Sequence, residues 1–143
     1  MADNLTPGER SEIMSRVRGR DTRPELLVRS MLHRMGYRFT VHGPKNRSLP
    51  GRPDIVLPKH RAVVFVHGCF WHAHPNCPDH RIPKSRVDFW KAKIEGNRAR
   101  DERNEAALHE LGWNVIVVWT CRLKSNASRT SLENEFAQTL QPR

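Results

Sequence analysis

The stretch DIVLPKHRAVVFV, residues 54–66, decides how this chain folds. It contains two nearly continuous apolar and β-branched runs, residues 54–57 and 62–66, separated by the turn-forming segment PKHR at residues 58–61. Two such runs joined by a short turn predict a hairpin of antiparallel strands. Because few polar residues alternate with the apolar ones, we expect both strands to be central and covered on both faces. The sequence thus predicts a sheet built around this hairpin.

Two signatures of helix starts precede the hairpin, at residues 6–9 and 22–25. Each has the form of a capping box with proline at the first helical position. The first predicts an N-terminal helix at about residues 7–18. The second predicts a helix that carries apolar residues at helical spacing and ends at Gly36. The remaining upstream segments are a predicted strand and a loop rich in Gly, Pro, Asn and Ser: residues 37–41 and 42–52.

Downstream of the hairpin, helical and strand patterns alternate. We expect Ser85 to cap a long polar helix at about residues 86–111, which Gly112 ends. A buried strand follows at residues 113–119, and TSLE at residues 130–133 predicts the start of a final helix. The apolar face of that last helix is Leu132, Phe136 and Leu140. Strands interleaved with helices predict an α/β fold with a mixed central sheet flanked by helices.

The chain has the size and the charge of a small domain that binds polyanions. Its 143 residues, 37% of them hydrophobic, predict a single domain over residues 1–143. No apolar run is long enough to span a membrane, and the start MADNLTPG lacks the features of a secretion signal, so we expect a cytoplasmic protein. The 25 basic and 15 acidic residues give a net charge of +10, which favours nucleic acid as a partner. A basic ribosome-associated protein remains an alternative on charge alone.

Residues 68–83 lack any regular periodicity and are crowded with proline, histidine, cysteine and aromatic residues. Cys69, His74 and Cys77 lie within nine residues, and Cys121 follows the predicted strand near the C-terminus. Thiolate and imidazole are the ligands of tetrahedral structural zinc, so this spacing predicts a zinc site. The alternative is that the cysteines are small buried residues and the histidines lie on the surface. The choice of histidine ligand stays open because three others are close in sequence: His67, His72 and His80.

The hairpin also places a carboxylate where it can hold a metal. Asp54 is at the head of the first strand, and Val66 and His67 are at the far end of the second, so these ends lie side by side. A carboxylate and a neighbouring main-chain carbonyl can bind Mg²⁺. Asp54 could equally be a turn residue at a strand end. His72 is a candidate proton acceptor because imidazole titrates near neutrality, or it is a loop histidine without a role.

Two other acidic residues have structural explanations from the sequence alone. Glu25 is accounted for by its position in a capping box. Asp101 lies in the charged segment RARDER, residues 98–103, where ion pairing on a helix surface is the expected role.

Several aromatic residues are candidates for contact with DNA. Phe70 and Trp71 follow Cys69 in the irregular loop, and Trp90 lies at the start of the polar helix. Aromatic side chains can wedge between bases, and a mismatch lowers the cost of that insertion. Core packing is the alternative for each of them. It is the expected role of three further aromatic residues: Phe89, Trp113 and Trp119.

Long ordered motifs resemble those of the very-short-patch repair endonucleases. The likeness covers about residues 10–121 and is carried by Asp21, Thr22 and Glu25 together with LPGRPD at residues 49–54, VFVHGCFWH at 64–72, RVDFW at 86–90, NRARD at 97–101 and LGW at 111–113. This resemblance implies an enzyme that nicks one strand of duplex DNA on the 5′ side of the thymine in a T:G mismatch. Such mismatches arise when 5-methylcytosine deaminates, and the nick initiates very-short-patch repair. The implied fold is that of type II restriction endonucleases, with the usual second acidic residue and lysine of that site replaced.

The resemblance also implies roles for individual residues in the reaction. Asp54 and the main-chain carbonyl of Val66 would hold Mg²⁺, and His72 would act as the general base. His67 would contact the phosphate region. Support through His72 or through waters on the metal would come from two acidic residues, Glu25 and Asp101.

Zinc and DNA contacts follow from the same resemblance. The implied ligands of a structural Zn²⁺ are Cys69, His74, Cys77 and Cys121. The residues that would enter the DNA beside the mismatch are Met14, Phe70, Trp71 and Trp90. The expected partner is duplex DNA with a T:G mismatch, bound by a monomer that does not contact membranes, and mismatch-repair proteins are further candidates. Two alternatives remain: a zinc-braced DNA-binding module without catalysis, and a restriction-like nuclease with another target.

Overall fold

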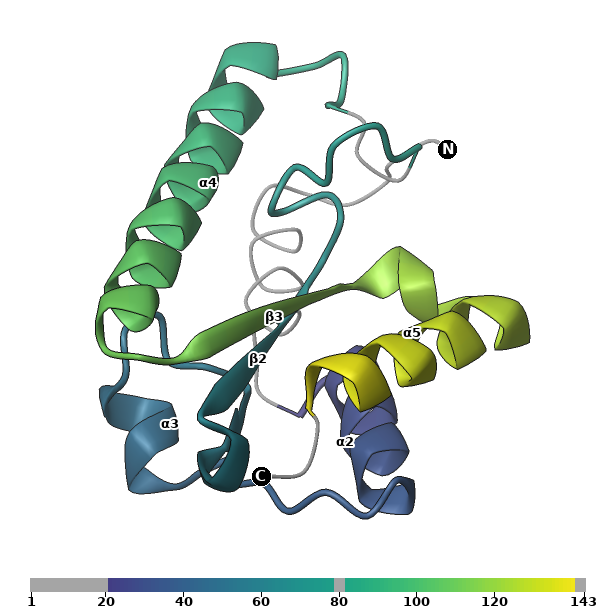
Figure 1. Ribbon diagram of the computed structural model, residues 1–143. Coiled ribbons are helices and arrows are strands. Elements are labelled where there is room, and N and C mark those ends of the chain that lie inside the picture. The colour runs from purple at the N-terminus through teal and green to yellow at the C-terminus, as the bar shows by residue number, and fades with distance from the viewer. Residues whose placement is uncertain (1–20, 79–81, 141–143) are drawn as a thin grey trace.

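A mixed β-sheet built on the predicted hairpin forms the centre of the fold (Figure 1). The computed structural model describes residues 21–78 and 82–140. Strand β1 (Ile55–Leu57) pairs antiparallel with β2 (Ala62–His67), and β2 pairs parallel with β3 (Asn114–Trp119). Within the described residues the strand order is β1-β2-β3. The predicted α/β class with a mixed sheet is therefore confirmed.

The register of the hairpin determines where its ends lie. Ile55 is paired with Val64, and the strands are joined by a 3-10 turn, Pro58–His60. Arg61 closes this turn with a left-handed φ of 48° and donates its N–H to the carbonyl of Pro58 at 3.1 Å. This register brings Asp54, the residue before β1, to the far end of β2.

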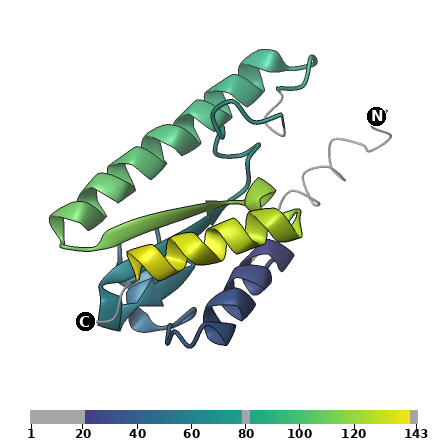
Figure 2. The same cartoon turned by 45° about the vertical axis from the view of Figure 1, so that its right-hand side comes forward.

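Helices cover both faces of the sheet (Figure 2). Helices α2 (Arg23–Arg34) and α5 (Asn126–Thr139) pack on one face, and α4 (Val87–Glu110) lies across the other. The core under α2 and α5 is larger, and its fully buried side chains include Leu32, Val64, Leu132 and Phe136. The core under α4 is smaller and consists of Val56, Val63, Leu108 and Trp113, with partly buried neighbours. The hairpin strands are thus covered on both faces, as predicted.

The predicted ends of two helices are confirmed. The Thr22 side chain accepts a hydrogen bond from the backbone N–H of Glu25 at 3.5 Å and caps α2. Gly36, with a φ of 88°, follows the end of this helix, and Gly112, with a φ of 86°, follows α4. A left-handed φ is accessible to glycine without steric cost, which explains why both helices end where they do.

Two predictions upstream of the hairpin are wrong. Residues 37–41 do not form a strand, since only Thr40 pairs, through an isolated bridge to Val56. The predicted loop at residues 42–52 contains a short helix, α3 (Pro44–Ser48). The buried amide of Asn46 binds the Thr40 and Pro53 carbonyls and the N–H of Gly43. The bond to the Gly43 N–H satisfies the N-cap residue of α3, which explains why a helix starts here.

The starts of the last two helices also differ from the prediction. Ser85 does not cap α4, because Arg86 occupies the N-cap with a φ of 56° and makes no side-chain capping bond. Helix α5 begins at Asn126 rather than near Thr130, because Ser125 accepts the N–H of Ser128 at 3.1 Å. Both differences are local competitions between capping residues, which sequence patterns resolve poorly.

Strand β3 is covered less completely than predicted. Ile116 and Val118 are buried, whereas Asn114 is exposed. The other residues of the strand, Val115, Val117 and Trp119, are partly exposed. The predicted N-terminal helix, with Met14, lies outside the described residues. No helix in the described part of the chain has both the length and the apolar character that crossing a membrane requires.

We expect the larger core to dominate stability. Phe136→Ala removes a fully buried ring and should lower the free energy of unfolding by about 3–5 kcal/mol. Phe89→Ala is the matched control, because the Phe89 side chain is 44% exposed, and it should change stability far less. Chemical denaturation of both variants measures the difference. Equal losses would contradict this assignment of the core.

Candidate active site and cysteine cluster

Asp54 lies against the end of strand β2. The backbone N–H of Val66 donates to the Asp54 Oδ2 at 2.7 Å, a contact that the hairpin register makes possible. Burial raises the pKa of the Asp54 carboxyl to about 6, the Val66 hydrogen bond opposes that rise, and the negative charge of Glu25 adds to it. A partly buried carboxylate with a raised pKa is a group whose ionised form a bound cation would stabilise.

Two histidines are stacked beside this carboxylate. His67 ends β2, and the following turn, in which the N–H of His72 binds the Gly68 carbonyl at 3.1 Å, returns His72 to it. Their ring centroids are 3.8 Å apart and the rings are nearly parallel, at 4°. Burial and the adjacent His72 lower the pKa of His67 to about 4, so His67 is neutral at physiological pH.

Asp101 reaches His72 from helix α4. Its Oδ2 lies 2.5 Å from the His72 Nδ1, and both side chains are about a quarter exposed. The expectation of an ion pair on the helix surface is therefore wrong for Asp101, and contact with His72 is one of the two roles that the family resemblance allowed for this residue. With Nδ1 held by the carboxylate, Nε2 of His72 is the nitrogen left to accept a proton. The ligand atoms of His67, His72 and Asp101 lie within 4.8 Å of one another.

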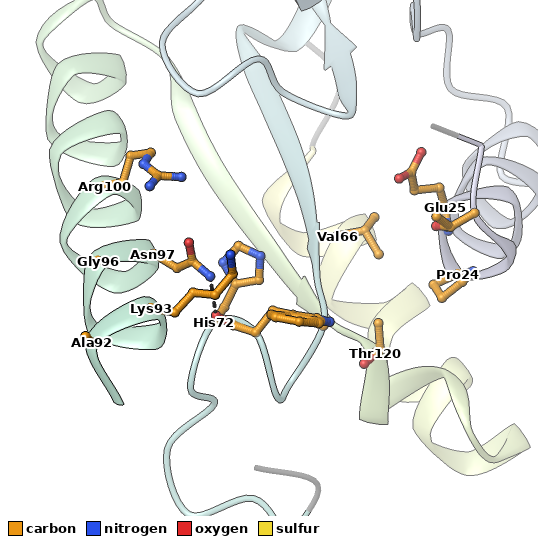
Figure 3. Close-up of a pocket in the computed structure, with 13 residues that line it drawn as sticks. Pro24, Glu25, Val66, His72, Ala92, Lys93, Gly96, Asn97, Arg100 and Thr120 are labelled. Carbon is orange, nitrogen blue, oxygen red and sulfur yellow. Dashed lines mark hydrogen bonds between the residues drawn. The ribbon is translucent and has the colours of Figure 1, made fainter. Parts of the chain in front are cut away.

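Glu25 lies in the first turn of α2 and faces the same region (Figure 3). Its Oε2 accepts the backbone N–H of Asp21 at 3.1 Å and a guanidinium N–H of Arg29 at 3.3 Å. The capping box is therefore only half formed at Thr22, since the return bond goes to Asp21 instead. The local role of Glu25 and its place beside Asp54 coexist.

Two adjoining cavities open on these groups. One, of about 650 Å³, is bounded by Glu25 on one side and by α4 on the other (Figure 3). The second, of about 530 Å³, contains Asp54, His67 and Asp101 in its wall. Among the described residues, three line both cavities: Val66, His72 and Arg100.

Sequence reasoning missed the α4 residues in the first cavity. Lys93, Asn97 and Arg100 all line it, and the Asn97 amide donates to the Trp71 carbonyl at 3.0 Å (Figure 3). Their spacing of four and then three residues places them on one face of a helix, which is the signal that could have found them. Thr120, at the end of β3, completes the opposite wall.

The four predicted zinc ligands come together in space. Cys69, His74, Cys77 and Cys121 each offer an atom within 4.8 Å of the others. Ligand sulfurs at about 2.3 Å from a tetrahedral zinc would be about 3.8 Å apart, so the set is compatible with zinc. Among the described residues, His74 is the histidine that lies in this set, whereas His67 and His72 lie in the other. His80 lies outside the described residues.

Two cysteines of this cluster have shifted pKa values, in opposite directions. Burial, together with the neighbouring Cys69 and Cys77, raises the pKa of Cys121 to about 12. Burial also acts upward on Cys69, but hydrogen bonds from Thr120 and Cys121 outweigh it and lower the pKa of that thiol. Cysteine and histidine side chains gathered this closely form a donor set that suits a divalent cation.

Trp119 connects the two clusters. Its ring stacks on His74 with centroids 4.3 Å apart and meets the edge of His67 at 5.5 Å. The expectation of simple core packing is wrong for this half-buried residue. It is confirmed for Trp113, which is 4% exposed.

The aromatic residues near the loop divide differently from the prediction. Phe70 and Trp71 are partly exposed and contact each other edge to face at 5.1 Å. Trp90, expected to enter DNA, is only 4% exposed and packs against both of them. Phe89, expected in the core, is 44% exposed, with the Arg86 guanidinium 4.2 Å from its ring centroid. The first turn of α4 turns Trp90 inward, which leaves Phe89 outside.

Comparison with known proteins gives a consistent result. A family described as DNA mismatch endonuclease Vsr matches residues 2–80. The type II nicking enzyme V.XorIIP of Xanthomonas oryzae is 56% identical over 123 residues, which cover 86% of this chain and 88% of that protein. The type II nicking enzyme V.NmeAIP of Neisseria meningitidis is 45% identical over 127 residues, which cover 89% of this chain and 88% of that protein. The DNA mismatch endonuclease Vsr of Escherichia coli is 42% identical over 130 residues, which cover 91% of this chain and 81% of that protein.

We expect Asp54→Asn to stabilise the metal-free protein at neutral pH. Because the folded-state pKa of about 6 lies above the ordinary 3.8, the ionised carboxyl destabilises the fold above pH 6, and this cost disappears as the pH falls below the ordinary value. Asparagine keeps an acceptor for the Val66 N–H without the charge. The gain should be roughly 1–3 kcal/mol at neutral pH.

Thermal unfolding in excess chelator at neutral pH and near pH 4 measures this effect. The advantage of the variant should shrink on acidification, because near pH 4 the wild-type carboxyl is neutral in the folded state and already partly protonated in the unfolded state. His67 has the opposite pH dependence but is present in both proteins, so it cancels in the comparison. A variant no more stable than wild type at neutral pH would refute the buried charge.

Proposed function

The chain belongs to the Vsr family of DNA mismatch endonucleases, and from this premise we propose that it nicks duplex DNA on the 5′ side of the thymine in a T:G mismatch. The reaction we propose is hydrolysis of one phosphodiester bond with the help of Mg²⁺. It would start the repair of mismatches left by deaminated 5-methylcytosine. The observation that carries the proposal is that two contacts lie at the same place, Val66 with Asp54 and His72 with Asp101. Val66 and His72 both line the two adjoining cavities.

The residues around Asp54 fit a catalytic cation. The carboxylate oxygens are hard donors of the kind that Mg²⁺ selects, and the raised pKa of Asp54 reflects a negative charge that lacks sufficient compensation. Asp54 and the main-chain carbonyl of Val66 would hold the ion. Bound there, it would neutralise phosphate charge and help to orient the attacking water.

The chain's own residues supply the proton transfer. Nε2 of His72 would take a proton from a water molecule as the water oxygen forms its bond to phosphorus. The bond from phosphorus to the leaving sugar oxygen breaks, and solvent provides the proton for that oxygen. Asp101 holds the tautomer of His72 with the proton on Nδ1 and stabilises the imidazolium that forms. His67, neutral and stacked on His72, would face the phosphate.

Recognition of the mismatch would rest on the aromatic residues beside the first cavity. Trp71 lines that cavity, and the ring of Phe70 contacts the ring of Trp71. We propose that these two rings insert next to the T:G pair, where unstacking costs least. Trp90 supports them from its buried position, and Met14 would approach from the N-terminal segment.

The cysteine cluster would hold a structural zinc. With four protein donors, Cys69, His74, Cys77 and Cys121, the tetrahedron is closed to substrate. The ion would tie the irregular segment after β2 to the end of β3. That tether would keep Phe70, Trp71 and His72 in position without taking part in the reaction.

The alternatives concern catalysis and target. A DNA-binding module without activity is disfavoured by the carboxylate of Asp54 beside Val66 and by the contact of His72 with Asp101, which binding alone would not require. A nuclease for a matched recognition sequence remains compatible with the site chemistry, and only the substrate distinguishes it.

The substrate prediction is that a duplex with one T:G pair is nicked with Mg²⁺ on the thymine strand, and the matched T:A duplex is cut at least about 100-fold more slowly. Strand-resolved gel analysis of end-labelled duplexes measures both rates. Asp54→Asn is the control, since it keeps the fold and should abolish nicking.

Equal cutting of the two duplexes would favour a restriction-like target. Tight mismatch binding without cleavage under any divalent metal would favour a binding module.

For the metal, we expect purified protein to contain one zinc ion per chain. Cys121→Ser should reduce the zinc content well below that value and lower the melting temperature, because the cluster loses the ligand that links it to β3. Elemental analysis and thermal unfolding measure the two effects. Full zinc content in this variant would remove Cys121 from the ligand set.

A further inference from the structure

Arg100 occupies the boundary between the two cavities of the active site. Val66 and His72 are the other described residues that line both, so Arg100 is the only cation among the three. It extends from α4 on the same side of the first cavity as Asn97 and His72, opposite Glu25 (Figure 3). Its neighbour in sequence, Asp101, holds His72.

No described residue neutralises the charge of Arg100. Within the described residues, no hydrogen bond or ion pair engages its guanidinium, although Asp54, Glu25 and Asp101 are all nearby in the cavity walls. Arg29 shows the contrast, since it pairs with Asp21 at 2.7 Å and with Glu25 at 3.3 Å. An exposed arginine facing a reaction site without a carboxylate partner is free to bind an anion.

We propose that Arg100 contacts the non-bridging oxygens of the scissile phosphate and stabilises the negative charge that builds on them. A guanidinium presents a planar fork of N–H donors that matches two phosphate oxygens. Stabilisation of charge at a transferring phosphoryl group is the main contribution a protein can make to such reactions. This proposal rests on the function proposed above, because it takes His72 and Asp54 as the place of reaction.

In the part of the chain that the structure describes, two other basic residues line these cavities, and each lines only one of them. Lys93 lines the first cavity and is absent from the wall that contains Asp54, whereas Arg52 lines the second and is absent from the first. A phosphate attacked by water beside His72 and held near Asp54 must lie where the two cavities meet. Arg100 is the cation at that boundary.

The role of Arg100 in the step involves no proton transfer. As the water oxygen bonds to phosphorus and the sugar oxygen departs, the guanidinium donates hydrogen bonds to the oxygens that remain on phosphorus. The water proton goes to His72, and the leaving oxygen takes its proton from solvent. Arginine suits this task because it stays charged throughout.

A matched pair of substitutions tests the proposal. Arg100→Gln and Arg103→Gln each remove one positive charge from an exposed position on α4, and Arg103 lines neither cavity. Under single-turnover conditions with saturating enzyme and Mg²⁺, Arg100→Gln should slow nicking about 100-fold or more, and Arg103→Gln less than about 3-fold. Arg100→Lys keeps the charge but loses the fork, so we expect an intermediate rate.

A binding cycle separates a phosphate contact from a structural effect. In chelator, the affinity of each protein is measured for the duplex with a normal scissile linkage and with a neutral methylphosphonate there. Wild type and Arg103→Gln should lose affinity equally on this change. Arg100→Gln should lose little, because the contact is already gone.

Equal rates for the two glutamine variants, or an equal methylphosphonate penalty for all proteins, would overturn the role of Arg100. If wild type does not nick the T:G duplex, the proposed substrate fails first, and both measurements are made on the duplex that it does nick. Wild-type nicking of T:G with an unaffected Arg100→Gln would overturn the Arg100 proposal alone.

Discussion

The hydrogen bond from the Val66 N–H to the Asp54 carboxylate joins the start of β1 to the end of β2, and the candidate active site is built around this point. It exists because β1 and β2 pair antiparallel with Ile55 opposite Val64, which places the start of one strand beside the end of the other. The same pairing buries the carboxyl enough to raise its pKa to about 6. A shift of one residue in this register would turn the inward-facing side chains outward and separate the two groups. The hydrophobic burial of both strands therefore also protects the site.

From that point the chain builds the site in two directions. The segment after β2 returns His72 onto His67, and helix α4 brings Asp101 to His72 from the other side. A series of ring contacts links the two clusters: His72 stacks on His67, His67 meets the edge of Trp119, and Trp119 stacks on His74 of the cysteine cluster. The cluster and the candidate active site are thus parts of one packed unit. An irregular segment in so small a domain needs such bracing, because it has few backbone hydrogen bonds of its own.

Local signals predicted the regular elements well. The hairpin, the α2 cap at Thr22 and the helix ends before Gly36 and Gly112 all follow from interactions within a few residues. The errors arise where two local options compete. Ser85 and Arg86 are both adjacent to the start of α4, and in the segment predicted to be a loop the Asn46 side chain binds the Gly43 N–H at the start of α3. Such outcomes depend on contacts with residues outside the few neighbours that a local sequence pattern includes.

By itself, the sequence determined the secondary structure around residues 54–67, the donor types for a zinc-like cluster and the residues that resemble a mismatch endonuclease. Tertiary structure alone decided which groups meet. It paired His72 with Asp101 across 29 residues, selected His74 for the cysteine cluster, buried Trp90 and placed Arg100 at the meeting point of the two cavities. The physical reason is that periodicity and capping report interactions along one element. Contacts between elements depend on how helices pack against the sheet, and that is set by the summed burial of side chains far apart in the chain.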